Sequence, residues 1–356
     1  MTLFKPEPFS RRLKALVIAL LATCGLLFAA AGWRMWKDAE LQGRWRAPGE
    51  MVSVDGRRLH VLCMGHGEPT MVLEAGMSGG SQDWSLVQAR LAERGQVCSY
   101  DRAGYGWSDP APAPREGMAA VEDLRRALDI AGIPRRRLLV GHSMGGLLIG
   151  MYARAHPDEV DGLAFLDAVG RDYARQFPPE RYRAFRAEFG RMLSVAAVTA
   201  MADVPQLLDQ PASLVAARLP MDQRDAAVAR SLSVRSYRTL RQENDAFDAV
   251  LAQALEMGPL PDVPTVVMSS TLMIDFPPGL DDEVMHQAWQ KNQISIAQEA
   301  HVRPIVLAGS GHYLQVDRPD AVVRELSAWR DRVRRAQPVV SGMQDVGYGP
   351  CTKEQG

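Results

Sequence analysis

The sequence contains, at residues 138–148, the stretch Leu-Leu-Val-Gly-His-Ser-Met-Gly-Gly-Leu-Leu. An apolar run leads into Gly-x-Ser-x-Gly, and apolar residues at helical spacing follow it, which predicts a strand, a sharp turn and a helix. This pattern is typical of a nucleophile elbow, in which Ser143 adopts a strained backbone conformation and projects its hydroxyl from the edge of a sheet. At Gly141 and Gly145 a Cβ would collide with the crossing strand and helix. The amides at the start of the helix would favour negative charge beside Ser143.

Strands and helices alternate on both sides of this stretch. A hairpin is expected at 51–63, around Asp55-Gly56. The other expected strands are 70–73, 97–100, 162–166, 264–268 and 303–307, and the expected helices are 84–91, 118–131, 282–299 and 320–335. This alternation predicts an α/β fold with a mostly parallel, doubly wound sheet. Residues that directly follow its strands should meet at one edge, where such sheets bind ligands.

A serine hydroxyl needs an adjacent base and an orienting acid to act as a nucleophile at neutral pH. His312 is the best candidate base, because it follows the last expected strand in a Gly-Ser-Gly-His turn. Two aspartates are candidates for the acid. Asp167 ends the strand after the elbow, and Asp275 follows the next strand. From the residues alone, either could reach His312.

Two backbone amides are candidates for an oxyanion hole, which needs preorganised donors. The amide of Met144 follows the serine, and the amide of Met77 lies in the glycine-rich loop after residue 74. Glycine at position 76 lets this loop approach the elbow closely. His142 is expected to face away from the nucleophile. The candidate substrate-binding residues are Gly76, Trp84 and His142.

Four motifs occur in order along the chain: the glycine-rich loop after residue 74, Asp-Arg-Ala-Gly-Tyr-Gly-Trp-Ser-Asp at 101–109, Gly-His-Ser-Met-Gly at 141–145 and Gly-His-Tyr at 311–313. With them, residues 50–336 resemble the α/β-hydrolase superfamily, in its capped, serine-nucleophile branch. The resemblance implies a helical cap at 170–261 that shapes the acyl or leaving-group pocket. It favours Asp167 as the acid, because some relatives place it about two dozen residues beyond the nucleophile, and Asp167 lies 24 residues beyond Ser143.

The oxyanion loop departs from the family pattern, because Ala75-Gly76 stands where His-Gly is usual. The serine nucleophile argues against the cleavage of haloalkanes or epoxides, since relatives that cleave these substrates carry aspartate in place of Ser143. Serine implies acyl transfer to water through an acyl-enzyme. We therefore expect a carboxylesterase or lipase-like enzyme for a small or medium apolar ester. An amidase, a C–C hydrolase, a cofactor-free peroxidase and a non-catalytic binding protein of the same fold remain alternatives.

Composition and charge exclude several other classes of function. The formal net charge of −1 gives no reason to expect a nucleic acid as partner. The four cysteines form no Cys-x-x-Cys or Cys/His cluster, so a zinc site is not expected. No cofactor is expected for a serine hydrolase of this kind either. Cys63 and Cys98 each lie on an expected strand and are expected to be buried thiols rather than a disulfide. The oligomeric state is not indicated.

The N-terminus carries an uncharged apolar run at 15–33, long enough to span a bilayer as a helix. Basic residues within 1–14 favour a cytoplasmic N-terminus. We expect an uncleaved signal anchor, and a secretory signal peptide cut after residues 29–31 is the alternative. Both place the rest of the chain outside the cytoplasm, in the periplasm or the extracellular space.

The sequence predicts seven segments along the chain. They are a cytoplasmic basic segment (1–14), a transmembrane anchor (15–33), a linker (34–49), the hydrolase core in two parts (50–169 and 262–336), the helical cap (170–261) and a disordered tail (337–356). Apolar side chains of the cap are expected either to line the substrate pocket or to form the core of the cap. They are Phe177, Tyr182, Phe185, Phe189, Met192 and Met201.

Overall fold

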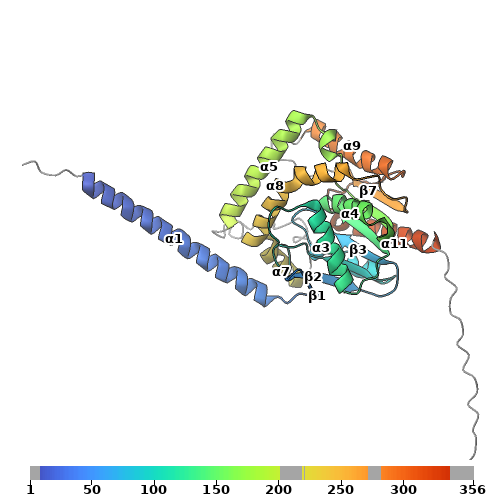
Figure 1. Cartoon of the computed structure of the whole chain (residues 1–356), viewed down its shortest axis with the longest axis horizontal. Coiled ribbons are helices and arrows are strands. Elements are labelled where there is room, and N and C mark those ends of the chain that lie inside the picture. Colours follow the sequence, from blue (N-terminus) through green and yellow to red (C-terminus); the bar gives the residue numbers. More distant parts are fainter. Residues whose placement is uncertain (1–8, 201–218, 220, 272–281, 337–356) are drawn as a thin grey trace, which may run out of the picture.

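An eight-stranded sheet forms the centre of the part of the chain that the structure describes, with helices on both faces (Figure 1). This computed structural model describes residues 9–200, 219, 221–271 and 282–336. The strands are β1 (Glu50–Val54), β2 (Arg57–Met64), β3 (Thr70–Glu74), β4 (Val97–Tyr100), β5 (Arg137–His142), β6 (Val160–Leu166), β7 (Thr265–Ser270) and β8 (Ile305–Leu307).

The strand order is β1-β2-β4-β3-β5-β6-β7-β8. β1 and β2 form the expected hairpin, and β2 also pairs antiparallel with β4. All pairs from β4 to β8 are parallel. The expectation of a mostly parallel sheet is therefore confirmed. β5 lies between β3 and β6, so the residues after these three strands lie together at the carboxyl edge.

Helices cover the two faces of the sheet as the alternation of apolar residues requires. They are η1 (Ser81–Trp84), α2 (Gln88–Ala92), α3 (Gly117–Ile130), α4 (Met144–Ala155), α9 (Glu283–Glu299), α10 (Leu314–Asp317) and α11 (Pro319–Ala336). Val72 and Leu139 pack in the cluster that holds α3, α4 and α9. Leu73 and Leu138 point the other way, into the cluster that holds α2 and α11. The helix expected at 84–91 is in fact split between η1 and α2.

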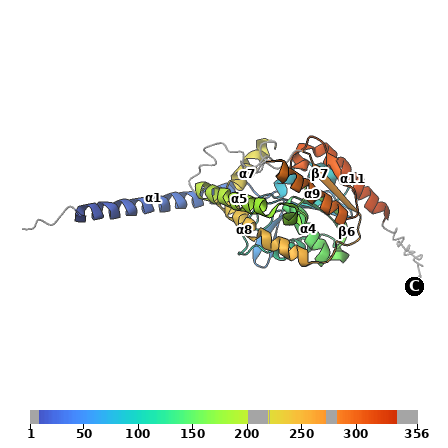
Figure 2. The same ribbon diagram turned by 90° about the horizontal axis from the view of Figure 1, so that it is seen from above.

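A helical insertion separates β6 from β7. It contains η3 (Tyr173–Gln176), α5 (Pro179–Ala200), α7 (Met221–Ser231) and α8 (Val234–Glu256). Figures 1 and 2 show α5 and α8 side by side next to the sheet. The described part of 170–261 is therefore helical, as the resemblance implied.

The N-terminal helix α1 spans Phe9–Arg44 and projects away from the sheet (Figure 1). Within it, Leu13–Lys37 is long and apolar enough to cross a membrane by length and composition, and none of its described side chains is buried. The expected linker at 34–49 is wrong for its first part, because the helix continues to Arg44. Residues 34–42 contain neither glycine nor proline and mostly favour a helix, so nothing ends it at the edge of the apolar run.

Cys63 and Cys98 form a disulfide, so the expectation of two buried thiols is wrong. The two residues lie directly opposite each other on the antiparallel strands β2 and β4, with their Cα atoms 4.0 Å apart. The pairing of β2 with β4 joins strands that are not consecutive in the sequence. The pattern of single strands carries no signal of that contact.

Three predictions lie outside the described residues. They concern the tail at 337–356, the candidate acid Asp275 and the cap residue Met201. These three remain predictions from the sequence.

Candidate active site

Ser143 stands at the turn between β5 and α4, with φ of 53° and ψ of −124°. Such a conformation is costly for a residue other than glycine and persists only where the surroundings hold it. The two glycines of the motif explain how this turn fits. A Cβ at Gly141 would lie 2.5 Å from the carbonyl oxygen of Gly145, and a Cβ at Gly145 would overlap the carbonyl oxygen of Glu74. The crossing of strand and helix is therefore as close as the motif predicts.

Asp167 follows β6 directly and is completely buried. Its Oδ2 lies 2.7 Å from Nδ1 of His312. The carboxylate also accepts hydrogen bonds from the amide of Ser270 at 3.0 Å, from the Ser270 hydroxyl at 3.1 Å and from Nε1 of Trp289 at 3.2 Å. These donors fix the carboxylate so that it can orient the imidazole. The pairing of His312 with Asp167 is one of the two that the sequence left open.

Ser270 and Trp289 were not identified from the sequence. Ser270 is the last residue of β7, and Trp289 lies on α9. Each looks like an ordinary strand or helix residue in its own segment. Only the packing of β7 and α9 against the end of β6 gives them a role at Asp167.

His142 is buried and lies next to His312. Its Nε2 donates to the backbone carbonyl of His312 at 2.9 Å, and the two ring centroids are 4.6 Å apart. Burial, together with the neighbouring His312, lowers the pKa of His142 well below its ordinary value, so this ring is neutral. His142 therefore supports the loop that carries His312 and also borders the cavity described next.

A cavity of about 730 Å³ opens at the carboxyl edge of the sheet. Its wall includes six of the residues that the sequence singled out: Gly76, Met77, His142, Ser143, Met144 and His312. The helical insertion adds an apolar side to the same cavity. The apolar residues there include Tyr173, Phe185, Phe189, Met192, Leu193, Leu240 and Phe247. Of the expected cap residues, Phe177 is instead buried in the core.

Trp84 is not part of this wall, and its expected role in substrate binding is wrong. Its side chain is completely buried at the end of η1. It packs in the same core cluster as Leu91 and Trp329. The large apolar side chain faces the sheet. The prediction failed because the sequence around Trp84 does not show which side of a short 3-10 turn faces the sheet.

The two amides expected in an oxyanion hole both belong to residues on the cavity wall. Met144 is the first residue of α4, so its amide has no acceptor within the helix. Met77 belongs to the loop after β3. The loop approaches the serine closely, since a Cβ at Gly76 would lie only 3.0 Å from Cβ of Ser143.

The described residues can therefore support nucleophilic acyl transfer. A serine on a strained turn shares one cavity with an imidazole, whose Nδ1 is held by a buried carboxylate. Nε2 of the imidazole is left for proton transfer. Within the described residues, no group of three or more His, Cys, Asp or Glu side chains is arranged to hold a metal ion.

Comparisons with known proteins agree with this architecture. A curated relative named "Putative carbamate hydrolase RutD", from Klebsiella pneumoniae subsp. pneumoniae, is 34% identical over 166 residues. The match covers 46% of this chain and 60% of the relative, so the chain spans well under the relative's full length.

Two solved structures share the fold. The structure titled "Epoxide hydrolase CorEH without ligand" has a TM-score of 0.60 at 18% identity and covers 80% of this chain and 99% of its own. That of "a membrane phospholipase A, a novel bacterial virulence factor" has a TM-score of 0.52 at 23% identity and covers 92% and 100%. At these identities the likeness concerns the fold alone. Residues 69–319, well over half of the sequence, match the family model described as "alpha/beta hydrolase fold", and the chain therefore belongs to that family.

Proposed function

We propose that this hydrolase cleaves a carboxylic ester with Ser143 as the nucleophile, His312 as the base and Asp167 as the acid. The observation that carries the proposal is the 2.7 Å contact between His312 and the buried Asp167. It lies at the cavity that Ser143 also borders. A histidine held in this way by a carboxylate is the arrangement that activates a serine hydroxyl.

In the reaction, His312 Nε2 takes the proton of Ser143 as the hydroxyl oxygen attacks the ester carbonyl. The amides of Met77 and Met144 donate to the oxyanion of the tetrahedral intermediate, and each donor is worth about 3 kcal/mol in such sites. The intermediate collapses to an acyl-enzyme while His312 returns the proton to the leaving alcohol. Water, activated by the same imidazole, then releases the acid and restores Ser143.

The side of the cavity that the insertion forms supports an apolar substrate. Phe185, Phe189 and Met192 come from α5, and Phe247 comes from α8. Apolar walls with few polar groups are typical of sites that bind apolar ligands. A cavity of about 730 Å³ has room for a small or medium acyl chain.

Carbamate or amide hydrolysis is a second candidate activity. The relative named as a carbamate hydrolase favours it, although the match covers only 60% of that protein. The same serine, histidine and aspartate would act on either bond. An amide expels an amine, to which His312 must return the proton. A p-nitrophenyl carbamate expels p-nitrophenol, as the ester does, and leaves a carbamoyl-enzyme in place of the acyl-enzyme.

The test is a substrate panel with the full-length protein in detergent. It includes p-nitrophenyl esters of increasing chain length, the matching anilides and a p-nitrophenyl carbamate. Ester turnover is expected to be at least tenfold faster than anilide or carbamate turnover, and to be abolished by Ser143→Ala. Ser85→Ala is the control, since the half-buried Ser85 hydroxyl donates to the carbonyl of Gln82 and does not line the catalytic cavity. Faster carbamate turnover would favour the second candidate, and activity in Ser143→Ala would reject the serine mechanism.

We also propose that α1 anchors the chain in a membrane, with the catalytic domain outside the cytoplasm. The length and apolar character of Leu13–Lys37 support an anchor. The Cys63–Cys98 disulfide supports an oxidising compartment, because such bonds are rare in the cytosol. Cleavage after residues 29–31 and secretion is the alternative.

Contacts just after α1 hold the domain close to this helix. The carbonyl of Trp45 accepts hydrogen bonds from Nε1 of Trp107 at 3.1 Å and from Arg230 at 2.8 Å. The proposed topology is tested by fractionating cells and treating intact spheroplasts with protease. Membrane-bound protein whose catalytic domain is digested in intact spheroplasts is the expected result. Soluble cytoplasmic protein would contradict it.

A further inference from the structure

Arg102 belongs to the Asp-Arg-Ala-Gly-Tyr-Gly-Trp-Ser-Asp loop after β4, and only 2% of its side chain is exposed. Nη1 donates to Oε1 of Glu74 and to the carbonyl oxygen of Ala75, both at 2.6 Å. Nη2 donates to the carbonyl oxygen of Gly76 at 2.7 Å. One guanidinium group therefore binds three consecutive residues at the start of the oxyanion loop.

The contact with the Gly76 carbonyl also fixes the direction of the next N–H group, that of Met77. In a trans peptide, the C=O of one residue and the N–H of the next point in opposite directions across one rigid plane. The peptide between Gly76 and Met77 thus has its oxygen bound to Arg102 and its N–H directed away from Arg102. Met77 borders the catalytic cavity. The amide of Gly79 also donates to the carbonyl oxygen of Gly76, at 3.1 Å. The guanidinium group and this amide together set the orientation of the Met77 amide, which the proposed function places in the oxyanion hole.

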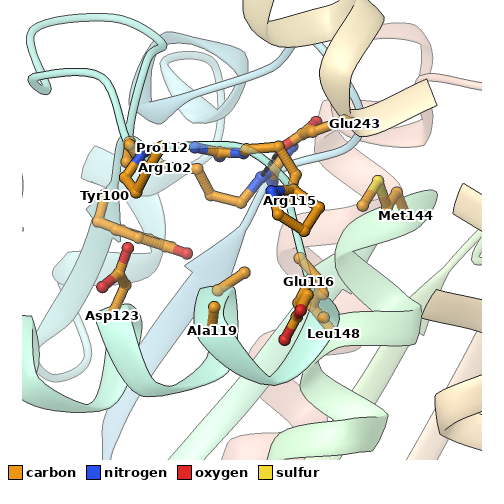
Figure 3. Close-up of a pocket in the computed structure, with 15 residues that line it drawn as sticks. Tyr100, Arg102, Pro112, Arg115, Glu116, Ala119, Asp123, Met144, Leu148 and Glu243 are labelled. Carbon is orange, nitrogen blue, oxygen red and sulfur yellow. Dashed lines mark hydrogen bonds and ion pairs between the residues drawn. The ribbon is translucent and has the colours of Figure 1, made fainter. Parts of the chain in front are cut away.

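The helical insertion completes this arrangement. Glu243, on α8, is 2% exposed and accepts from Nε of Arg102 at 3.0 Å and from Nη2 at 3.2 Å. Arg115 and the hydroxyl of Tyr105 also donate to Glu243, at 3.3 Å and 2.9 Å. Figure 3 shows Arg102, Arg115 and Glu243 together, with Met144 nearby.

This buried group pairs two arginines with two acidic side chains. Burial raises the pKa of Glu74, and the neighbouring Arg102 opposes this rise. Two guanidinium groups, of Arg102 and Arg115, face the carboxylates of Glu74 and Glu243. Burial opposes ionisation of Glu243, but the two arginines hold its pKa below the ordinary value. Without Glu243, Arg102 would be left with one carboxylate in a site from which water is largely excluded. A planar guanidinium is also the only common side chain that can bind two carbonyls and two carboxylates at once.

We propose that Arg102 is a positioning residue for the oxyanion loop and that Glu243 couples this loop to the helical insertion. The inference rests on the proposed function. α8 also supplies Leu240 and Phe247 to the cavity wall. α8 therefore shapes the substrate cavity and, through Glu243 and Arg102, also holds the Met77 amide that would donate to the oxyanion. A movement of α8 would change the cavity and the oxyanion hole together.

The test compares Arg102→Lys and Glu243→Gln with the wild type, using full-length protein in detergent and p-nitrophenyl butyrate. Lysine keeps the charge but cannot bind both carbonyls, and glutamine keeps one acceptor but loses the charge. We expect kcat to fall about 10- to 100-fold in Arg102→Lys and about 5- to 20-fold in Glu243→Gln, with KM within about threefold, since losing one oxyanion donor typically costs 100- to 1,000-fold. The inhibition constant of a trifluoromethyl ketone, which forms an oxyanion on the serine, should rise by the same factors.

Glu159→Gln is the matched control. Glu159 is also a buried carboxylate held by an arginine, Arg125, at 2.9 Å. It lies directly before β6, at the amino edge of the sheet, away from the catalytic cavity. Its loss should lower the unfolding temperature and leave kcat within about twofold.

Several outcomes would overturn the proposal. One is an unchanged kcat in both folded variants; another is a rise in KM alone. A third is a loss of kcat in Glu159→Gln as large as in Glu243→Gln, which would point to general destabilisation. If Arg102→Lys does not fold, Glu243→Gln decides. A wild type that cleaves no ester rejects the proposed function and this inference together, whereas an active wild type with fully active variants rejects this inference alone.

Discussion

Asp167 shows how much of the proposed chemistry depends on single hydrogen bonds. Its carboxylate accepts from His312, Ser270 and Trp289 at one completely buried position. An asparagine there would keep the size but present an amide N–H to one of these donors. The imidazole would then be held in the wrong tautomer for taking a proton from Ser143.

We therefore predict that Asp167→Asn lowers kcat about 1,000- to 10,000-fold, the scale seen when a triad acid loses its charge. Asp275→Asn should keep kcat within about threefold of the wild type. Both are measured with p-nitrophenyl butyrate on folded protein. The opposite ranking would assign the acid to Asp275.

Two glycines on helices differ in the space around them and give a matched pair of stability predictions. A Cβ at Gly145, on α4, would overlap the backbone of Glu74, whereas a Cβ at Gly190, on α5, would meet only Asn244 at 3.5 Å. Gly145→Ala should lower the free energy of unfolding by about 1–3 kcal/mol, as overpacking does. Gly190→Ala should raise it by about 0.5–1 kcal/mol, because alanine favours a helix. Urea titrations measure both, and equal effects would contradict the close crossing at the elbow.

Among the elements, η1 carries a buried acid with a pH-dependent effect on stability. Burial, and then the neighbouring Asp101, raises the pKa of Asp83 to about 7, against 3.8 for the free side chain. Folding therefore favours the protonated form. The protonated Asp83 contributes at most about 4 kcal/mol to the free energy of unfolding. This contribution is fully present below about pH 4 and is lost as the pH rises toward 7.

Asp83→Asn should remove this dependence. The variant's free energy of unfolding, relative to that of the wild type, is expected to be more favourable at pH 8 than at pH 5. Urea titrations at the two pH values measure the difference. A relative stability that does not change with pH would show that Asp83 is already ionised in the folded protein at pH 5, so that its pKa is not raised to about 7.

The pair β2–β4 carries the disulfide, which closes a stretch of 35 residues. Loops of this length predict a contribution of about 2–4 kcal/mol to stability. The double variant Cys63→Ala/Cys98→Ala should lose this amount in a urea titration without reductant, and the wild type should lose it when dithiothreitol is added. Wild-type protein with two reactive thiols at these positions, or with stability unchanged by reductant, would contradict the bond.

Features with a local sequence signal could be predicted, whereas features that depend on long-range packing could not. The strands, the elbow and the turn with His312 follow from apolar periodicity and from glycines near the ends of strands, which are local signals. The disulfide, the donors Ser270 and Trp289, and the contacts of Arg102 join segments that are far apart in the sequence. The burial of Trp84 depends on which way a short turn faces. These features depend on the order of strands and the packing of helices, which periodicity does not contain.

For the whole molecule, the fold concentrates the chemistry at one edge. β5, β6 and the loop after β8 bring Ser143, Asp167 and His312 to the carboxyl side of the sheet. The insertion adds apolar residues to the cavity on that side. The apolar helix α1 projects from the same domain. Together with the proposed membrane anchor, this apolar pocket would suit esters that partition into lipid.

The most direct test of this account is labelling of the full-length protein with a fluorophosphonate probe, followed by peptide mass mapping. We predict one phosphonylated residue, Ser143, with labelling lost in Ser143→Ala and slowed strongly in Asp167→Asn. An unlabelled but folded wild type, or a label on another serine that persists in Ser143→Ala, would contradict the assignment of Ser143 as the nucleophile.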